Sequence, residues 1–208
     1  MLKIAVSKGR VENEFCGILE KSGYDVQPIK NKQRKLFIQT KDNMQIFFVK
    51  ADDIMTYLRL GMIDIGIVGK DILLESDFSN YQELLDLKIG KCKFCLASYA
   101  NYKNKTLNRQ QVIATKYPNI TKQFFKNKKE NIQIVKLNGS VELGPIVKIS
   151  DAIVDIVETG DTLKENGLEV IEEICDISTR LVANNKSLNS KNKEISDFVN
   201  KIEGGIKC

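Results

Sequence analysis

Apolar and polar residues alternate along the first part of the chain with the two periods that strands and helices require. Residues 2–6 alternate with a period of two, which predicts a strand. Phe15, Ile18 and Leu19 follow at helical spacing, in a segment that closes at Gly23. The chain is therefore expected to begin with a strand followed by an amphipathic helix.

The same two periods continue in the next fifty residues. Segments 35–39 and 44–50 read as a strand pair joined by a turn at residues 42–43. Residues 52–60 are expected to be helical. Residues 63–69 are apolar on both sides, as in a strand buried on both faces of a sheet, and a short helix is expected after them.

Further strands are predicted over residues 89–97, 111–115, 132–137 and 171–182. A helix is expected over residues 120–126, and Asn138-Gly139-Ser140 is expected to cap another one, which contains Glu142 and Leu143. The stretch 184–193 is polar and is expected to be flexible. Apolar residues then recur at positions i, i+3, i+4 and i+7 of a final helix, namely Ile195, Phe198, Val199 and Ile202.

Alternating strands and helices predict an α/β fold with mostly parallel sheets, in which ligands gather beyond the carboxyl ends of strands. A charge shift and a long strand begin near residue 89, and a strand returns near residue 175. We therefore expect two lobes, the second inserted into the first. The first lobe takes residues 1–88 and 176–208, and the second takes residues 89–175.

Composition narrows the class of protein. The 208 residues are 42% hydrophobic, enough for a full core, and 32 basic against 27 acidic residues give a net charge of +5. That charge suits an anionic small-molecule substrate as well as nucleic acid, but the basic residues are scattered and only 7% of residues are aromatic, which disfavours nucleic-acid binding. Without a signal-peptide core or an apolar run of about 20 residues, a cytoplasmic protein that does not enter the membrane is expected.

The chain contains no histidine, which excludes Ser-His-Asp and Cys-His nucleophile systems and any imidazole acid–base step. An enzyme of this composition must work by positioning and charge stabilisation, with Mg²⁺ held by carboxylates and substrate phosphates. Five cysteines fit reduced thiols better than a disulfide framework. Cys92 and Cys95 fall on opposite faces of a predicted strand, so a structural role is favoured over a metal or redox pair.

Residues 151–167 are the most informative stretch, because a short apolar strand runs into a Thr-Gly turn that opens a helix. Free N–H groups at a helix start bind phosphate, and Gly160 lets the chain approach the ligand closely. Asp151 and Asp155 are expected to share one face and to reach sugar hydroxyls. The alternative is that Thr159 or Thr162 simply caps a helix, and Glu158 and Asp161 oppose a bare anion.

Polar and basic residues follow several predicted strands. They are Lys8, Lys70, Lys116, Ser140 and Thr159. Lys8-Gly9-Arg10 is read either as a solvated turn or as a grip on a triphosphate, with an ammonium and a planar guanidinium. Gly66-x-x-Gly69-Lys70 lacks the spacing and the following Ser or Thr of a Walker loop, so a P-loop is rejected.

Six segments in series resemble the short form of the ATP phosphoribosyltransferase family. They are Ser7-Lys8-Gly9-Arg10, Gly66-Ile67-Val68-Gly69-Lys70-Asp71, Glu83-Leu84-Leu85-Asp86-Leu87, Ala114-Thr115-Lys116-Tyr117-Pro118-Asn119, Leu137-Asn138-Gly139-Ser140-Val141-Glu142-Leu143 and Asp151-Ala152-Ile153-Val154-Asp155 to Gly167. The resemblance implies two lobes like those of type II periplasmic binding proteins. It also implies the first step of histidine biosynthesis, in which N1 of ATP attacks C1 of phosphoribosyl diphosphate and pyrophosphate leaves.

The resemblance assigns roles to individual residues. Phosphoribosyl diphosphate would be bound by Asp151, Asp155, Glu158, Thr159, Gly160, Asp161, Thr162 and Leu163, and ATP by Lys8, Gly9, Arg10, Lys70, Lys116 and Ser140. Lys50, Arg34 and Asp155 would be catalytic. Lys50 stands where relatives often have arginine, so a bidentate contact is lost there. Mg²⁺ would bridge the pyrophosphate oxygens.

The resemblance also implies partners. The chain ends where long-form relatives continue into a regulatory domain, so the expected partner is a histidyl-tRNA-synthetase-like regulatory subunit, with the catalytic chains dimeric inside a hetero-oligomer. Two alternatives stay open from the sequence: a non-catalytic, cytoplasmic, two-lobed ligand-binding or sensing module, and a phosphoribosyltransferase that acts on another base.

Overall fold

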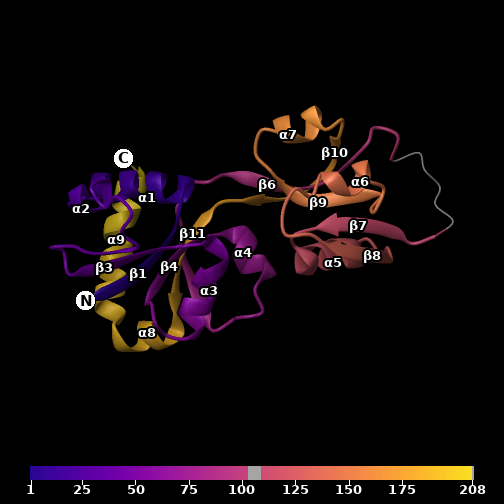
Figure 1. Ribbon diagram of the computed structural model, residues 1–208. Coiled ribbons are helices and arrows are strands. Elements are labelled where there is room, and N and C mark those ends of the chain that lie inside the picture. Colours follow the sequence, from indigo (N-terminus) through magenta and orange to yellow (C-terminus); the bar gives the residue numbers. More distant parts are fainter. Residues whose placement is uncertain (103–108, 208) are drawn as a thin grey trace. The chain divides into compact units, whose positions relative to one another are not determined.

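The structure, a computed structural model, describes residues 1–102 and 109–207 (Figure 1). Its contacts divide the chain into two compact units. Unit 1 consists of Met1–Gly90 and Ser178–Cys208, and unit 2 of Lys91–Ile177. Unit 2 is therefore an insertion in unit 1, and both junctions lie two residues further along the chain than the expected boundaries.

Backbone hydrogen bonds explain where the first junction falls. The N–H of Leu87 donates to the carbonyl of Thr179 (3.0 Å), and the N–H of Thr179 donates to the carbonyl of Ile89 (2.9 Å). These bonds hold the segment before Gly90 against the start of the returning chain. Residues 89–90 are thus part of unit 1, although their apolar pattern continues into the next strand.

In chain order, unit 1 contains β1 (Leu2–Ser7), α1 (Arg10–Lys21), α2 (Gln27–Lys30), β2 (Phe37–Gln39), β3 (Met44–Val49), α3 (Ala51–Arg59), β4 (Ile65–Gly69), α4 (Lys70–Glu75), β5 (Tyr81–Asp86), β11 (Thr179–Asn184), α8 (Asn185–Ser190) and α9 (Asn192–Lys207). Its sheet has the order β2-β3-β1-β4-β11-β5. Strand β1 pairs in parallel with both β3 and β4, so the carboxyl ends of these three strands lie at one edge of the sheet.

Helices cover both faces of the unit 1 sheet. On one face α1 and α9 pack together (Figure 1), and Phe15 and Leu19 of α1 meet Ile195, Phe198 and Ile202 of α9 in one buried cluster. On the other face α3 and α4 bury apolar side chains against β1, β4 and β11. The apolar periods predicted for the first and last helices are confirmed by this burial.

Unit 2 contains β6 (Cys92–Ser98), β7 (Gln111–Thr115), α5 (Pro118–Asn127), β8 (Ile132–Lys136), α6 (Leu143–Ile146), β9 (Ala152–Val157), α7 (Asp161–Glu165) and β10 (Glu169–Ile177). The sheet order is β10-β6-β9-β7-β8. Strand β7 is parallel to β8 and β9, whereas β6 is antiparallel to β9 and β10. Helix α5 packs on one face, and Leu163 of α7 packs on the other.

The predicted single strand over residues 171–182 is wrong. This segment forms two strands, β10 and β11, which are separated by Ser178. The two strands belong to different sheets in different units. The Ser178 hydroxyl donates to Asp86 Oδ1 (2.8 Å), at the end of β5. Strand β5 was not predicted, because its alternation of acidic and apolar residues is weak.

The polar stretch 184–193 is ordered, contrary to the prediction. Asn184 caps α8: its side-chain oxygen accepts from the N–H of Lys186 (2.8 Å), and its amide donates to the carbonyl of Leu58. The predicted cap at Ser140 is also wrong, because Glu142 occupies the cap position of α6. Ser140 instead has a φ of 47° and accepts through its carbonyl from the N–H of Leu143 (3.1 Å).

Two further expectations concern thiols and membranes. The four cysteines in the described part of the chain, Cys16, Cys92, Cys95 and Cys175, are not in disulfide bonds. Burial, the largest effect, raises the pKa of the Cys95 thiol. Among the described residues, no helix combines the length and the apolar character needed to cross a bilayer.

Candidate functional site

The predicted phosphate loop follows the carboxyl end of β9 in unit 2. After Val157 the chain turns through exposed Glu158 and Thr159, and Gly160 then adopts a left-handed φ of 83° immediately before α7. A side chain at this φ would be strained, so the turn requires glycine. The first N–H groups of α7 have no acceptor within the helix.

The cap of α7 decides between the two interpretations of its threonines. Gly160 occupies the cap position and has no side chain that could cap the helix, while Thr162 lies inside the helix. Thr159 Oγ1 accepts from the N–H of Asp161 at a long 3.4 Å. Neither threonine is therefore an ordinary helix cap, and both hydroxyls lie on exposed residues beside the turn.

A hollow of about 240 Å³ lies at this turn. It is lined by Glu142, Asp155, Ile156, Val157, Glu158, Thr159, Gly160, Thr162 and Leu163. Leu163 is 4% exposed and anchors α7 in the core, and this packing holds the start of the helix and the turn before it in place. The hollow is smaller than typical ligand pockets of roughly 300–1,000 Å³, a size that suits one anionic part of a substrate. The structure thus brings Asp155 together with the whole of segment 158–163.

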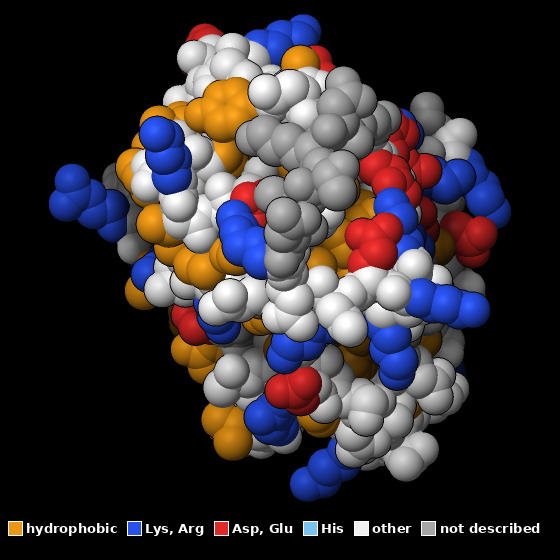
Figure 2. Space-filling view, turned by 90° about the vertical axis from the view of Figure 1, so that its right-hand side faces the viewer, with side chains coloured by type: hydrophobic (Ala, Val, Ile, Leu, Met, Phe, Trp, Pro, Cys, Tyr) orange, Lys and Arg blue, Asp and Glu red, His pale blue; other side chains and the backbone are white. Residues whose placement is uncertain are grey.

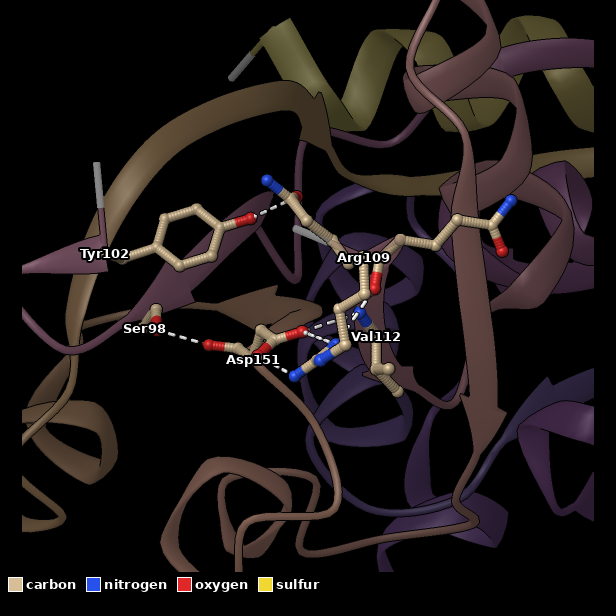
Figure 3. A network of polar contacts seen from close by, with 7 residues as sticks. Ser98, Tyr102, Arg109, Val112 and Asp151 are labelled. Carbon is tan, nitrogen blue, oxygen red and sulfur yellow. Dashed lines mark hydrogen bonds and ion pairs between the residues drawn. The ribbon is translucent and has the colours of Figure 1, made fainter. Parts of the chain in front are cut away.

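Asp151 is not among the residues that line this hollow, and Figure 3 shows its polar contacts. It precedes β9, at the opposite end of the strand from the turn, and lies four positions before Asp155, which corresponds to about 13 Å along a strand. Arg109 donates to both of its carboxylate oxygens (2.8 Å each), and the N–H of Val112 donates to Oδ2 (2.8 Å). The two aspartates share a face of the strand, and of the two only Asp155 lines the hollow.

The Asp151 network also fixes neighbouring strands. The hydroxyl of Ser98 on β6 donates to the Asp151 carbonyl (2.7 Å), and the Tyr102 hydroxyl donates to Gln111 Oε1 (2.6 Å). Burial raises the pKa of Tyr102 to about 12. These contacts make Asp151 a structural tie between β6, β7 and β9.

Two more predicted residues lie at the same edge of the unit 2 sheet as the turn. Lys116 follows β7 and Ser140 follows β8, and both strands run parallel to the β9 direction. The buried Thr115 hydroxyl donates to the Val154 carbonyl (2.7 Å) and accepts from the Tyr117 N–H (2.9 Å), which fixes the chain on both sides of Lys116.

In unit 1 a row of basic residues follows the parallel strands. Lys8 comes after β1, Lys50 caps α3 directly after β3, and Lys70 opens α4 after β4. Because these three strands end at one edge, their lysines lie along it. Gly9 has a φ of 92° and turns the chain from β1 into α1, which places Arg10 at the start of the helix.

Arg34 lies at the same edge. Strand β2 runs antiparallel to β3, and the N–H of Phe48 donates to the carbonyl of Leu36 (2.9 Å). The chain before Leu36 therefore continues alongside the segment after Phe48, which ends at Lys50. The five basic residues predicted in unit 1 thus follow one edge of one sheet, while Lys116 and Ser140 belong to unit 2.

Sequence reasoning missed the carboxylates that hold some of these cations. Glu83 pairs with Lys70 Nζ, and Glu14 Oε1 lies 3.5 Å from Arg10 Nε. Arg109, which binds Asp151 across 42 positions, was also missed. Only the helical i, i+4 spacing of Arg10 and Glu14 gave a signal in the sequence. The other pairs join elements whose neighbourhood depends on the fold.

Charge on the molecular surface bears on the nucleic-acid question. On the face shown in Figure 2, Lys and Arg side chains are interspersed with Asp and Glu rather than gathered in a stripe. Among the described residues, no group of three or more Asp, Glu, Cys or His side chains is arranged to hold a metal ion.

Comparison with known proteins gives a consistent result. The family model for ATP phosphoribosyltransferase matches residues 50–204. ATP phosphoribosyltransferase of Lactococcus lactis subsp. cremoris is 49% identical over 203 residues, which cover 98% of both chains. The solved ATP phosphoribosyl transferase (HisG:HisZ) complex from Thermotoga maritima contains a chain that is 36% identical, with a TM-score of 0.84 over 100% of this chain and 99% of that one.

A more distant likeness concerns the fold alone. The periplasmic aliphatic sulphonate binding protein SsuA from Escherichia coli matches with a TM-score of 0.60 at 12% identity, over 99% of this chain and 72% of that chain. The predicted α/β architecture of two lobes, similar to periplasmic binding proteins, is thereby confirmed. Family model and full-length identity agree, and the chain belongs to the ATP phosphoribosyltransferase family.

Proposed function

We propose that this chain transfers phosphoribosyl from phosphoribosyl diphosphate to N1 of ATP and releases pyrophosphate, the first step of histidine biosynthesis. The observation that carries the site assignment is the turn after β9, where Asp155, Thr159, Gly160 and Thr162 line one hollow at the start of α7. Such a turn offers hydrogen bonds to the 5-phosphate, each contributing about 1.5–3 kcal/mol when the acceptor is charged.

The reaction suits a site without histidine. Adenine N1 is already unprotonated at neutral pH, so it needs no base, and its lone pair forms the bond to C1 while the C1–O bond to pyrophosphate breaks. Catalysis then consists of alignment and neutralisation of the departing charge. We assign alignment of the ribose to Asp155, whose carboxylate lines the hollow, and withdraw that role from Asp151, which Arg109 holds at the far end of β9.

Neutralisation is assigned to cations. In unit 1 the phosphates of ATP and pyrophosphate would be bound by the basic residues along the sheet edge, Lys8, Arg10, Arg34, Lys50 and Lys70. In unit 2, Lys116 would add a positive charge, and the Ser140 hydroxyl would donate a hydrogen bond to ATP. Mg²⁺ would be held chiefly by phosphate oxygens, and Asp155 and Glu158 offer the hard oxygen ligands that it prefers at the hollow. The ion would supply further charge neutralisation.

The assay mixes the chain with ATP, phosphoribosyl diphosphate and Mg²⁺ and follows the absorbance of the N1-substituted adenine. We expect turnover that Thr159→Ala and Asp155→Ala abolish. Thr56→Ala, an exposed threonine on α3, is the matched control and should leave the rate unchanged. Absence of turnover in the natural chain would favour a ligand-binding module, and turnover with another base would favour a different phosphoribosyltransferase.

Regulation is proposed to need a second protein. By family resemblance, a histidyl-tRNA-synthetase-like subunit binds this chain and carries the histidine site, with catalytic chains paired inside a cytoplasmic hetero-oligomer. Light scattering of the mixed proteins should show a species heavier than either component. A mixture in which both proteins keep their separate masses would contradict the proposal.

A further inference from the structure

Glu14 on α1 makes two contacts that point in different directions. Its Oε1 lies 3.5 Å from Nε of Arg10, one helical turn earlier, and its Oε2 accepts from the N–H of Gly90 at 2.7 Å. Gly90 is 76 positions away and is the last residue of unit 1 before the chain crosses into unit 2. One carboxylate thus joins a predicted ATP-binding arginine to the junction.

The surroundings of Gly90 show that the junction is tightly packed around this contact. Gly90 has a φ of 59°, and a Cβ atom placed on it would lie 2.8 Å from Thr179 Oγ1 and 3.8 Å from Nη2 of Arg10. Thr179 is the first residue of β11, just after the chain returns from unit 2. The guanidinium therefore lies beside the outgoing segment, which itself packs against the returning one.

We propose that Glu14 is a positioning residue, which orients the Arg10 guanidinium toward the phosphates of ATP and makes that orientation depend on the conformation of the junction. The inference rests on the function proposed above. A carboxylate paired with a guanidinium restricts the rotamers of that long side chain and so limits the directions in which the guanidinium can approach a phosphate. An exposed i, i+4 pair contributes little to folding, so the contact is better explained by orientation than by stability.

Two substitutions separate the two contacts. Glu14→Gln keeps a carbonyl oxygen for the Gly90 N–H but removes the charge beside Arg10, whereas Glu14→Ala removes both. Glu203→Gln is the matched control, because Glu203 forms an i, i+4 pair with Lys207 (2.8 Å) on α9. The measurements are KM for ATP, KM for phosphoribosyl diphosphate, kcat, and hydrogen-exchange protection of the Gly90 amide.

For Glu14→Gln we expect KM for ATP to rise about five-fold, while KM for phosphoribosyl diphosphate, kcat and Gly90 protection stay within about two-fold. Glu14→Ala should in addition lose the Gly90 protection. In an Arg10→Ala background, Glu14→Gln should have no further effect, because it acts through the arginine. Glu203→Gln should match the natural chain.

An unchanged KM for ATP in Glu14→Gln would overturn the inference, and so would an effect that adds in full to that of Arg10→Ala. If Glu14→Ala does not fold, the inference is still tested by Glu14→Gln, measured in the natural chain and in the Arg10→Ala background. A natural chain without turnover would instead overturn the proposed function. In that case, calorimetric titration with ATP makes the same comparison between Glu14→Gln and the natural chain.

Discussion

At the scale of single residues, the two aspartates of β9 should behave differently. Asp155→Asn keeps the shape of the side chain but removes the charge from the hollow beside the phosphate turn. Losing one charged hydrogen bond to substrate corresponds to a decrease in kcat/KM for phosphoribosyl diphosphate of about ten- to hundredfold. Steady-state kinetics checks this, and thermal unfolding should show an unchanged midpoint.

Asp151→Ala should instead affect stability. The change removes the acceptor of the Val112 N–H and of both Arg109 nitrogens, at 2.8 Å each. Because the Arg109 side chain is 57% exposed, its ion pair contributes little, and we expect a loss of about 1–2 kcal/mol in the free energy of unfolding. Denaturant titration measures it. A folded Asp151→Ala protein whose kcat/KM falls as far as that of Asp155→Asn would restore Asp151 to the site.

The sequence predicted the turn after β9 but not the distance that separates the two aspartates. The Thr-Gly turn and its position after an apolar strand were readable, because strand, glycine and helix start are local patterns. The four-residue spacing of the aspartates gave the correct face of β9 but not the distance along it. The partner of Asp151, Arg109, lies 42 positions earlier, and nothing local indicates that contact.

At the scale of elements, Asp64 joins the start of β1 to α8 and the residue after it. Its carboxylate accepts from the Lys3 N–H (2.9 Å), the Ser187 hydroxyl (2.7 Å) and Lys191 Nζ (2.6 Å). Burial acts to raise the pKa of Asp64, but these hydrogen bonds outweigh burial and hold the pKa below its ordinary value. The ionised carboxylate therefore stabilises the folded state.

The sign of this effect gives a pH dependence. A lowered folded-state pKa means that the stabilisation is complete above the ordinary value near 3.8 and is lost as the pH falls through the lower folded value. Unfolding measured from neutral pH to about pH 2 should show a loss of stability below about pH 4 that is smaller in Asp64→Asn. Equal acid dependence in both proteins would contradict the assignment.

Elements were predictable where their apolar period was strong and unbroken. The helix carrying Ile195, Phe198 and Ile202 is an example, since all three are buried. Helix α8 was missed because its stability comes from the Asn184 cap and the Asp64–Ser187 contact rather than from apolar residues. The break at Ser178 was missed because apolar residues resume at Leu181 after only three polar residues, Ser178, Thr179 and Arg180.

At the scale of the whole molecule, unit 2 should fold without unit 1, whereas the N-terminal segment of unit 1 should not fold without the C-terminal one. Unit 2 is one continuous segment with a five-stranded sheet and cores on both faces. Unit 1 needs both ends of the chain, because β11 lies between β4 and β5 in its sheet and α9 packs on α1. Removal of residues 178–208 leaves β5 without its neighbour and exposes the apolar face of α1.

A fragment of residues 91–177 should therefore unfold cooperatively by circular dichroism and show dispersed amide resonances, whereas residues 1–90 alone should not. Adding a peptide of residues 178–208 to residues 1–90 supplies the missing strand and helix, and it should restore part of the signal at high concentration, since the covalent link no longer provides effective concentration. A cooperatively folded 1–90 fragment would show that the four strands β1 to β4 suffice without β11, and that the dependence of unit 1 on its returning chain is weaker than the strand order implies.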